Sequence, residues 1–133
     1  MVHGTLDHVG VVVRDFDATA ARYARLGLTV ASRLVFEDRG VIRGYLSDGR
    51  SIVELHQPLR ADTPLARFLG DQEEVQHHLC FAVDDLEGGI AALEADGYAL
   101  EPGSPWNGSR GRNAYLAPPP AGGLVLELVE KYS

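Results

Sequence analysis

The amino-acid sequence contains one segment twice, and this repeat limits the folds open to the chain more than any other feature. A stretch that begins at His8 aligns without a gap with a stretch that begins at His78, at an offset of 70 residues (78 − 8 = 70). Identical residues stand at five aligned positions: His8/His78, Val13/Val83, Asp15/Asp85, Ala21/Ala91 and Gly27/Gly97. A fixed-offset repeat indicates duplicated supersecondary units that share one core.

The later parts of the two copies also match. The run GYL at Gly44–Leu46 aligns at the same offset with AYL at Ala114–Leu116. After a slip of three residues, IVEL at Ile52–Leu55 aligns with VLEL at Val125–Leu128. Each copy therefore opens on a histidine and closes on a glutamate, as a pseudo-symmetric metal site built from both halves requires.

The order of apolar runs and turn signals predicts the elements βαβββ in each copy. In the first copy, strands are expected at Leu6–Val13, Leu28–Glu37, Gly40–Leu46 and Ser51–His56, with a helix from Ala18 to Leu26. In the second, strands are expected at His77–Val83, Tyr98–Glu101, Arg112–Leu116 and Gly123–Glu130, with a helix at Leu86–Ala95. The helices are expected to start at Asp15 and at Asp84 or Asp85, and to stop at Gly27 and Gly97. Pro102–Gly111 and Ala117–Gly123 read as loops.

This pattern predicts an α+β fold, in which two tandem βαβββ modules form a curved mixed sheet around a metal-binding cleft. The chain of 133 residues is short enough for a single domain. We expect module one at about residues 4–57, a linker at 58–75 and module two at about 76–131. Within the linker, Thr63 is expected to cap a short helix at Pro64–Leu69.

Alternation along the strands places the histidines and glutamates on one face. Val9, Val11 and Val13 point one way and His8 the other, and His78 likewise opposes Leu79 and its neighbours. Glu54 and His56 oppose Val53 and Leu55, while Glu127 opposes Leu126 and Leu128. The large apolar residues are expected to pack against the helices. His8, Glu54, His78 and Glu127 are therefore predicted to line one concave surface.

Two imidazoles and two carboxylates form a suitable ligand set for one divalent ion. The two negative charges balance the ion, and such a centre can act as a Lewis acid on a carbonyl or enolate oxygen. A single strand histidine is more simply explained by an ordinary buried hydrogen bond. A glutamate inside an apolar strand is costly to bury alone, however, and here the pair occurs twice.

Composition excludes several classes of partner. The net charge of −7 gives no basic surface for a phosphate backbone, so no nucleic acid is expected. No apolar run is long enough for a membrane span, and no signal peptide is visible at the start. One cysteine, Cys80, rules out an internal disulfide and fits a reducing compartment, so a cytoplasmic location is expected.

The sequence resembles the vicinal oxygen chelate superfamily over nearly its whole length. The segments SIVELHQPL, TPLARFL, HHLCFAVDDLEGG and GGLVLELVE are most similar to the methylmalonyl-CoA epimerases, and TPLARFL is the most specific of them. The resemblance implies that His8, Glu54, His78 and Glu127 hold one divalent ion: Co, Ni, Mn, Zn, Fe or Mg. It also implies that Glu127 moves protons, that the substrate is a carbonyl compound such as an acyl-CoA, and that the protein is a homodimer.

Two positions depart from the epimerase pattern. Many bacterial epimerases carry a catalytic glutamate three residues after the glycine that matches Gly40, and here Arg43 stands at that position. The loop before the last strand reads APPPAGG instead of a His-Pro-Lys-Ser type run. Arg43, Tyr45, Asn113 and Tyr115 are expected on the concave face as substrate-binding residues. His56 and Trp106 are expected as packing or rim residues, and a position facing the cavity stays open as the alternative.

Metal-dependent enolisation by an isomerase or lyase is the leading interpretation. A glyoxalase-type lyase and a tailoring enzyme of secondary metabolism share the same ligands and stay open as alternatives. A non-catalytic antibiotic-binding protein is disfavoured by the intact ligand set. An extradiol dioxygenase would use two histidines and one carboxylate, so Glu54 argues against it.

Overall fold

The computed structural model describes residues 2–108 and 110–133 as a mixed α+β fold. This part of the chain contains three helices, α1 (Phe16–Ala24), α2 (Pro64–Leu69) and α3 (Leu86–Ala95). Its strands are β1 (Gly4–Val13), β2 (Thr29–Phe36), β3 (Val41–Ser47), β4 (Ile52–Pro58), β5 (Glu74–Val83), β6 (Ala99–Leu100), β7 (Trp106–Asn107), β8 (Gly111–Ala117) and β9 (Val125–Lys131). The elements belong to two compact units, His8–His77 and a second unit that joins His78–Ser133 with the stretch up to Asp7.

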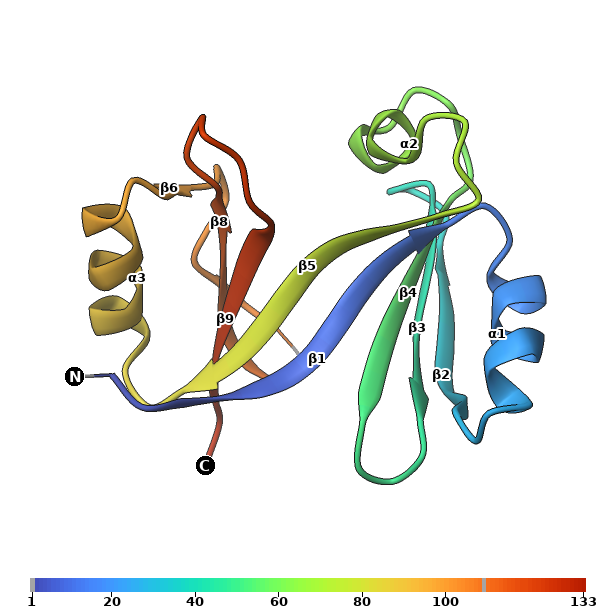
Figure 1. The fold of residues 1–133 in the computed structure, drawn as a ribbon, viewed down its shortest axis with the longest axis horizontal. Helices are drawn as coiled ribbons and strands as arrows, with labels where there is room; N and C mark the ends of the chain where they lie inside the picture. Colours follow the sequence, from blue (N-terminus) through green and yellow to red (C-terminus); the bar gives the residue numbers. More distant parts are fainter. Residues whose placement is uncertain (1, 109) are drawn as a thin grey trace. The chain divides into compact units, whose positions relative to one another are not determined.

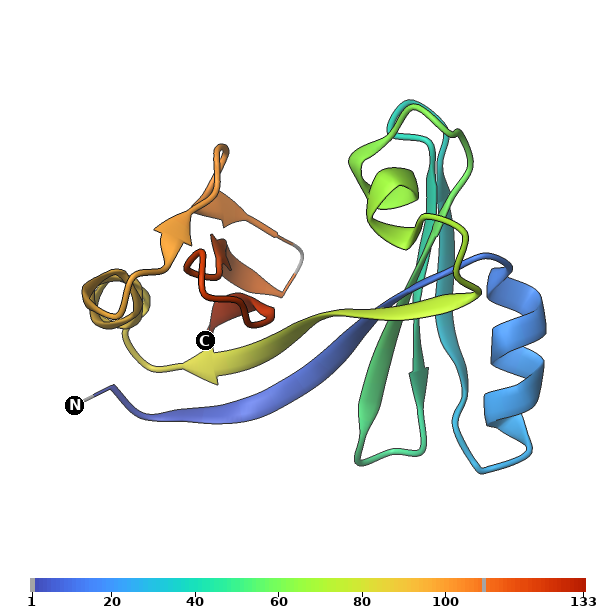
Figure 2. The same ribbon diagram turned by 45° about the horizontal axis from the view of Figure 1, so that its top comes forward.

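In the unit His8–His77, the strands are ordered β2-β3-β4-β1. Neighbours β2, β3 and β4 are antiparallel, whereas β1 runs parallel to β4. Figures 1 and 2 show α1 and α2 on opposite sides of β2, β3 and β4. The side chains that point toward α1 form the core of the unit. The opposite strand face carries polar residues.

The second unit repeats this plan. Its strands are ordered β5-β9-β8-β6, with β5 parallel to β9 and with β7 also paired to β8. The start of β1 belongs here too, since Asp84 donates its backbone N–H to the carbonyl of His3 at 3.1 Å. The buried carboxylate of Asp7 also binds Arg110 at 2.7 Å and Lys131 at 2.9 Å.

Both long helices begin with the same pair of devices. Asp15 accepts from the backbone N–H of Ala18, and Asp85 accepts from Gly88, so each aspartate is an N-cap. In each unit, a side chain on the strand that carries the glutamate (β4 or β9) then accepts a hydrogen bond from the first backbone N–H of the helix. These strand contacts run from Phe16 to Gln57 Oε1 at 2.7 Å and from Leu86 to Glu130 Oε2 at 2.8 Å. The helices are therefore fixed to the strands that carry the glutamates.

The apolar strand faces pack on the helices as the alternation predicts. In the first unit, Val13, Leu46 and Leu55 are fully buried with Phe16, and the partly buried Val11 and Val53 pack against this cluster. In the second unit, the core consists of Leu86, Ile90, Ala114, Leu116 and Leu128, with Phe81 and Val83 packed against them. Polar side chains on the other face are thereby directed away from both helices.

Helix α1 has an additional polar attachment that involves Glu74 at the start of β5. This carboxylate accepts from the side chains of Thr19, Arg22 and Tyr23. Burial opposes ionisation, yet the three hydrogen bonds hold the pKa of Glu74 below its usual value. Burial and the bond to Glu74 in turn raise the pKa of the Tyr23 phenol.

The expected elements are present, with one correction in the segment predicted as the loop Pro102–Gly111. There Trp106–Asn107 forms the short strand β7, which pairs with Asn113 and Arg112 of β8. The strand expected at Tyr98–Glu101 is reduced to Ala99–Leu100. Pro102 and Gly103 interrupt the second unit at the place where the first unit has the continuous strand β2, so two short strands, β6 and β7, form there instead. None of the helices among the described residues is long and apolar enough to cross a membrane.

Candidate metal centre

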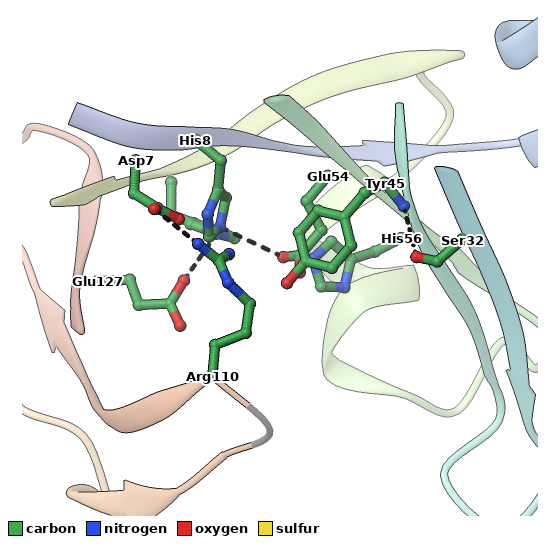
Figure 3. Close-up of polar contacts among 9 residues, drawn as sticks. Asp7, His8, Ser32, Tyr45, Glu54, His56, Arg110 and Glu127 are labelled. Carbon is green, nitrogen blue, oxygen red and sulfur yellow. Dashed lines mark hydrogen bonds and ion pairs between the residues drawn. The ribbon is translucent and has the colours of Figure 1, made fainter. Parts of the chain in front are cut away.

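Each unit contains one buried histidine–glutamate pair. In the unit His8–His77, His8 on β1 and Glu54 on β4 lie on parallel neighbouring strands. The Nε2 atom of His8 is 3.7 Å from Oε1 of Glu54, and both residues are at most 5% exposed. Figure 3 shows the two side chains directed toward one another, with Tyr45 and His56 beside them.

The second unit holds the equivalent pair. His78 on β5 and Glu127 on β9 are again carried by parallel neighbours, and Nε2 of His78 is 3.2 Å from Oε1 of Glu127. His78 is completely buried and Glu127 is 6% exposed. The four residues singled out by the repeat thus form two matching pairs, one in each unit.

A tyrosine ring packs edge-on against each histidine. Tyr45 lies opposite Glu54 across β3 and β4, and its ring meets that of His8 at 5.8 Å and an angle of 81°. Tyr115 lies opposite Glu127 across β8 and β9, and meets His78 at 5.3 Å and 78°. Edge-to-face contact is a favourable geometry for aromatic rings, so each tyrosine limits the orientations open to its histidine.

A serine hydroxyl supports each of these tyrosines from the strand or loop beyond. The backbone N–H of Tyr45 donates to Ser32 Oγ at 3.2 Å, where β2 shifts register. The backbone N–H of Tyr115 donates to Ser104 Oγ at 3.0 Å. Both serines lie where the neighbouring chain leaves regular pairing, so a side chain replaces the missing ladder carbonyl.

His56 lies on the strand face of Glu54, as the alternation predicts, but its contact with Glu54 was not predicted. It is 6% exposed, and its Nε2 atom lies 2.6 Å from Glu54 Oε1. The separation of two residues on a strand places both side chains on one face, but it does not give the distance between them. His56 therefore belongs to the glutamate's immediate surroundings and is not a rim residue.

The substrate-binding candidates fall into two kinds of surroundings. Arg43 lies opposite His56 on the strand face of Tyr45, with its guanidinium 4.8 Å from the centre of the Phe36 ring. Asn113 instead donates its side-chain amide to the carbonyl of Gly111 at 3.0 Å. Trp106 stacks on Tyr115 at 5.1 Å, in agreement with its expected role in packing.

The donor set of each pair suits a divalent cation. Imidazole nitrogen and carboxylate oxygen are ordinary ligands of zinc and of other first-row metals. A carboxylate buried this deeply is stabilised by a positive partner, and a bound cation supplies that charge. Each pair offers two ligands, half of the set that such an ion takes from a protein.

Comparison with known proteins gives a family match. Residues 7–116 match the model of the glyoxalase/bleomycin resistance protein/dioxygenase superfamily. The ethylmalonyl-CoA/methylmalonyl-CoA epimerase of Cereibacter sphaeroides is 33% identical over 129 residues, which cover 94% of this chain and 96% of that protein. This relative is named as an enzyme, and its similarity extends over almost the full length of the chain.

Solved structures give the same result. The methylmalonyl-CoA epimerase of Mycobacterium tuberculosis matches with a TM-score of 0.78 and 28% identity, over 96% of this chain and 88% of that chain. A variant of the Streptomyces coelicolor enzyme in complex with 2-nitronate-propionyl-CoA matches with a TM-score of 0.77 and 32% identity, over 96% and 97%.

Proposed function

Since the chain belongs to the glyoxalase/bleomycin resistance protein/dioxygenase superfamily, we propose that it is a metal-dependent epimerase of an acyl-CoA such as methylmalonyl-CoA. The observation that carries this proposal is the recurrence of a buried histidine–glutamate pair at equivalent positions of both units. Relatives named as epimerases over nearly the whole chain supply the reaction class.

We propose that His8, Glu54, His78 and Glu127 together hold one divalent ion. Their nitrogen and oxygen atoms are ligands that cobalt, nickel, manganese, zinc or iron accept in proteins. When bound, such an ion supplies Lewis acidity toward a carbonyl oxygen. The edge-on tyrosines restrict the two imidazoles and so reduce the entropy lost on binding.

Glu127 is the proposed proton carrier. The proton to be removed lies on a carbon between a thioester carbonyl and a carboxylate, and the carbanion's charge is shared with the carbonyl. A carboxylate within hydrogen-bond reach can act as the general base for such a step. Epimerisation also requires a proton to be delivered to the opposite face of the carbanion. Position 43 holds an arginine, which stays protonated at neutral pH and cannot replace a second carboxylate, so water supplies that proton.

We propose that Arg43 binds substrate and takes no part in proton transfer. Its charge is fixed by resonance, and its guanidinium is held over Phe36 on the strand face that carries Glu54 and His56. We propose that it binds the carboxylate of the substrate, with Tyr45, Asn113 and Tyr115 as the other substrate-binding residues. The same features favour a smaller anionic or phenolic substrate as the second candidate, in a tailoring or lyase reaction.

Deuterium exchange at the α-carbon of methylmalonyl-CoA in heavy water tests the reaction. We expect exchange in the presence of Co²⁺, faster for one stereoisomer because a single carboxylate moves the proton. Absence of exchange in protein that carries its metal would contradict the thioester proposal and favour the smaller substrate bound by Arg43.

Metal binding is tested separately by elemental analysis after reconstitution. We expect about one equivalent of Co²⁺ per chain from a single set of four ligands. A double substitution, His8→Ala with His78→Ala, should abolish binding. Stoichiometric metal in that variant would falsify the ligand assignment. Trp106, the one tryptophan of the chain, gives an independent fluorescence signal from beside Tyr115.

We further propose that the protein is a homodimer. Strand β2 is an edge strand of its unit, and Val30, Leu34 and Val35 on it are each 46–58% exposed. Apolar edge strands are usually covered by another strand or chain. Sedimentation at micromolar concentration should give the mass of two chains, and a monomer would exclude the dimer without affecting the metal proposal.

A further inference from the structure

The two glutamates lie in different surroundings, although the repeat makes them equivalent. Glu54 has His56 two residues later on the same strand face, and Glu127 has Val129 at that position. The pairing confirms the correspondence, since His56 lies opposite Arg43 and Val129 opposite Asn113, the repeat partner of Arg43. A valine side chain has no hydrogen-bond donor. One glutamate thus has an imidazole within hydrogen-bond distance at a position where the other has only methyl groups.

The contact between His56 and Glu54 is short and buried. Nε2 of His56 lies 2.6 Å from Oε1 of Glu54, and the two side chains are 8% and 6% exposed. An ionised carboxylate can only accept, so the imidazole must donate from Nε2. A bond of this length to a charged oxygen is among the stronger kinds of hydrogen bond in proteins.

His56 is itself held from several sides. Its strand lies between β3 and β1, which places Arg43 and Val12 at the paired positions. The ring of His77 lies 6.4 Å away, and Phe68 of α2 packs edge-on against His77 at 4.8 Å. A ring surrounded in this way has few other orientations, so the direction of its N–H is set by the fold.

We propose that His56 is a positioning residue, which fixes the carboxylate of Glu54 as a metal ligand. The inference rests on the proposed metal site. The N–H of His56 occupies one lone pair of Oε1, and this bond restricts the orientation of the carboxylate. Residues that hydrogen-bond a metal's carboxylate ligand generally raise its affinity for the metal.

Metal affinity of the whole chain is the first measurement. His56→Leu removes the donor and should weaken the Co²⁺ Kd about 10- to 100-fold, the range found when such partners of metal ligands are lost. His56→Gln, whose amide can donate from near the position of Nε2, should stay within about threefold of wild type by the same comparison. Val129→Ala is the matched control in the other unit. It alters the equivalent buried position without removing a hydrogen-bond donor, and no change in Kd is expected.

A second readout separates positioning from a general structural role. If His56 acts only by fixing a ligand, the activity lost in His56→Leu should return at saturating Co²⁺, with kcat near that of wild type. Unchanged Co²⁺ affinity in His56→Leu would overturn the proposal. If that variant does not fold, His56→Asn serves instead, because its side chain is too short to reach Oε1 and should show the same loss.

Imidazole nitrogen NMR of the metal-free protein tests the hydrogen bond without any metal. A protonated Nε2 on His56, with an exchange-protected proton at low field, is expected. A ring protonated only at Nδ1 would overturn the proposal. If wild type binds no Co²⁺, the proposed function is wrong, whereas this signal still decides whether His56 holds Glu54.

Discussion

The two histidine–glutamate pairs are closely similar in construction and differ mainly beside the glutamate. Both have parallel strands, an edge-on tyrosine and a serine beneath that tyrosine's backbone N–H. Glu54 has a second histidine, His56, two residues later on its strand, whereas Glu127 has Val129 there. The residue opposite His56 is Arg43, and the residue opposite Val129 is Asn113. The shared parts are those that any metal site needs. The differing parts are where two duplicated halves can take different roles in one reaction.

Replacing each glutamate by glutamine in turn should distinguish the residue that acts as general base from the one that acts only as a metal ligand. We expect Glu127→Gln to lower α-proton exchange about 10²- to 10⁴-fold at saturating metal, the range typical of general-base removal. Glu54→Gln should mainly weaken Co²⁺ binding, with exchange recovering as Co²⁺ is raised. Equal losses of exchange in the two variants at saturating metal would show that the glutamates are not specialised.

Gly44 and Ala114 are aligned in the repeat, but only one of them tolerates a methyl group. A Cβ on Gly44 would lie 2.0 Å from the carbonyl oxygen of Ser32, whereas Ala114 is fully buried in its core. Gly44→Ala should destabilise the first unit by about 3 kcal/mol, at the upper end of typical overpacking costs. Ala114→Gly should cost about 1 kcal/mol. Urea unfolding measures both, and similar losses would mean that β2 can move aside.

The helices are attached to their units by different chemistry. Glu74 binds three side chains of α1, whereas the equivalent positions on α3 are Gly89, Ala92 and Leu93. Glu74→Gln should therefore destabilise the protein by about 2 kcal/mol at pH 7, as expected for hydrogen bonds to a charged group.

The effect of Glu74 should depend on pH in one direction. Its pKa is lowered in the folded state, so its contribution is complete above the unfolded value of about 4.5. That contribution is lost as the pH falls through the lower folded value. Denaturation of wild type and Glu74→Gln across pH 7 to pH 3 should show the difference shrinking on acidification. A constant difference would mean that the charge of Glu74 is irrelevant.

The two serines should behave alike, and they give the smallest effect. Ser32→Ala and Ser104→Ala each remove the acceptor of a tyrosine N–H, at a cost of about 1 kcal/mol. Ser→Thr at either position keeps the hydroxyl and is the control. A cost at one serine only would show that the supports are less equivalent than their geometry. Thermal unfolding measures each variant.

The repeat was enough to predict the order of elements, the helix caps and the strand face of the histidines and glutamates. Alternation within β1 and β4 determines that face, because a shift of one residue would bury Glu54 against α1. The capping aspartates could be predicted for a similar reason, since the N-cap position has a strong local preference.

Other features depend on contacts that a linear pattern does not contain. Trp106 lies in a stretch rich in proline and glycine, and it forms a strand only because β8 offers a paired edge. The supports at Ser32 and Ser104 arise where pairing is interrupted, and nothing local marks either serine. Alternation predicts the strand face of His56, but its distance from Glu54 depends on rotamers set by neighbouring strands.

The position of Asp7 has a consequence for how the chain forms during synthesis. The stretch up to Asp7 is synthesised before the unit His8–His77, yet it belongs to the unit that contains His78–Ser133, and Asp7 binds Arg110 and Lys131. The unit His8–His77 is continuous and can fold as soon as it has emerged. The stretch up to Asp7 must wait until Arg110 and Lys131 have been synthesised. A bulky fusion placed ahead of this stretch would therefore disturb the unit that contains His78–Ser133.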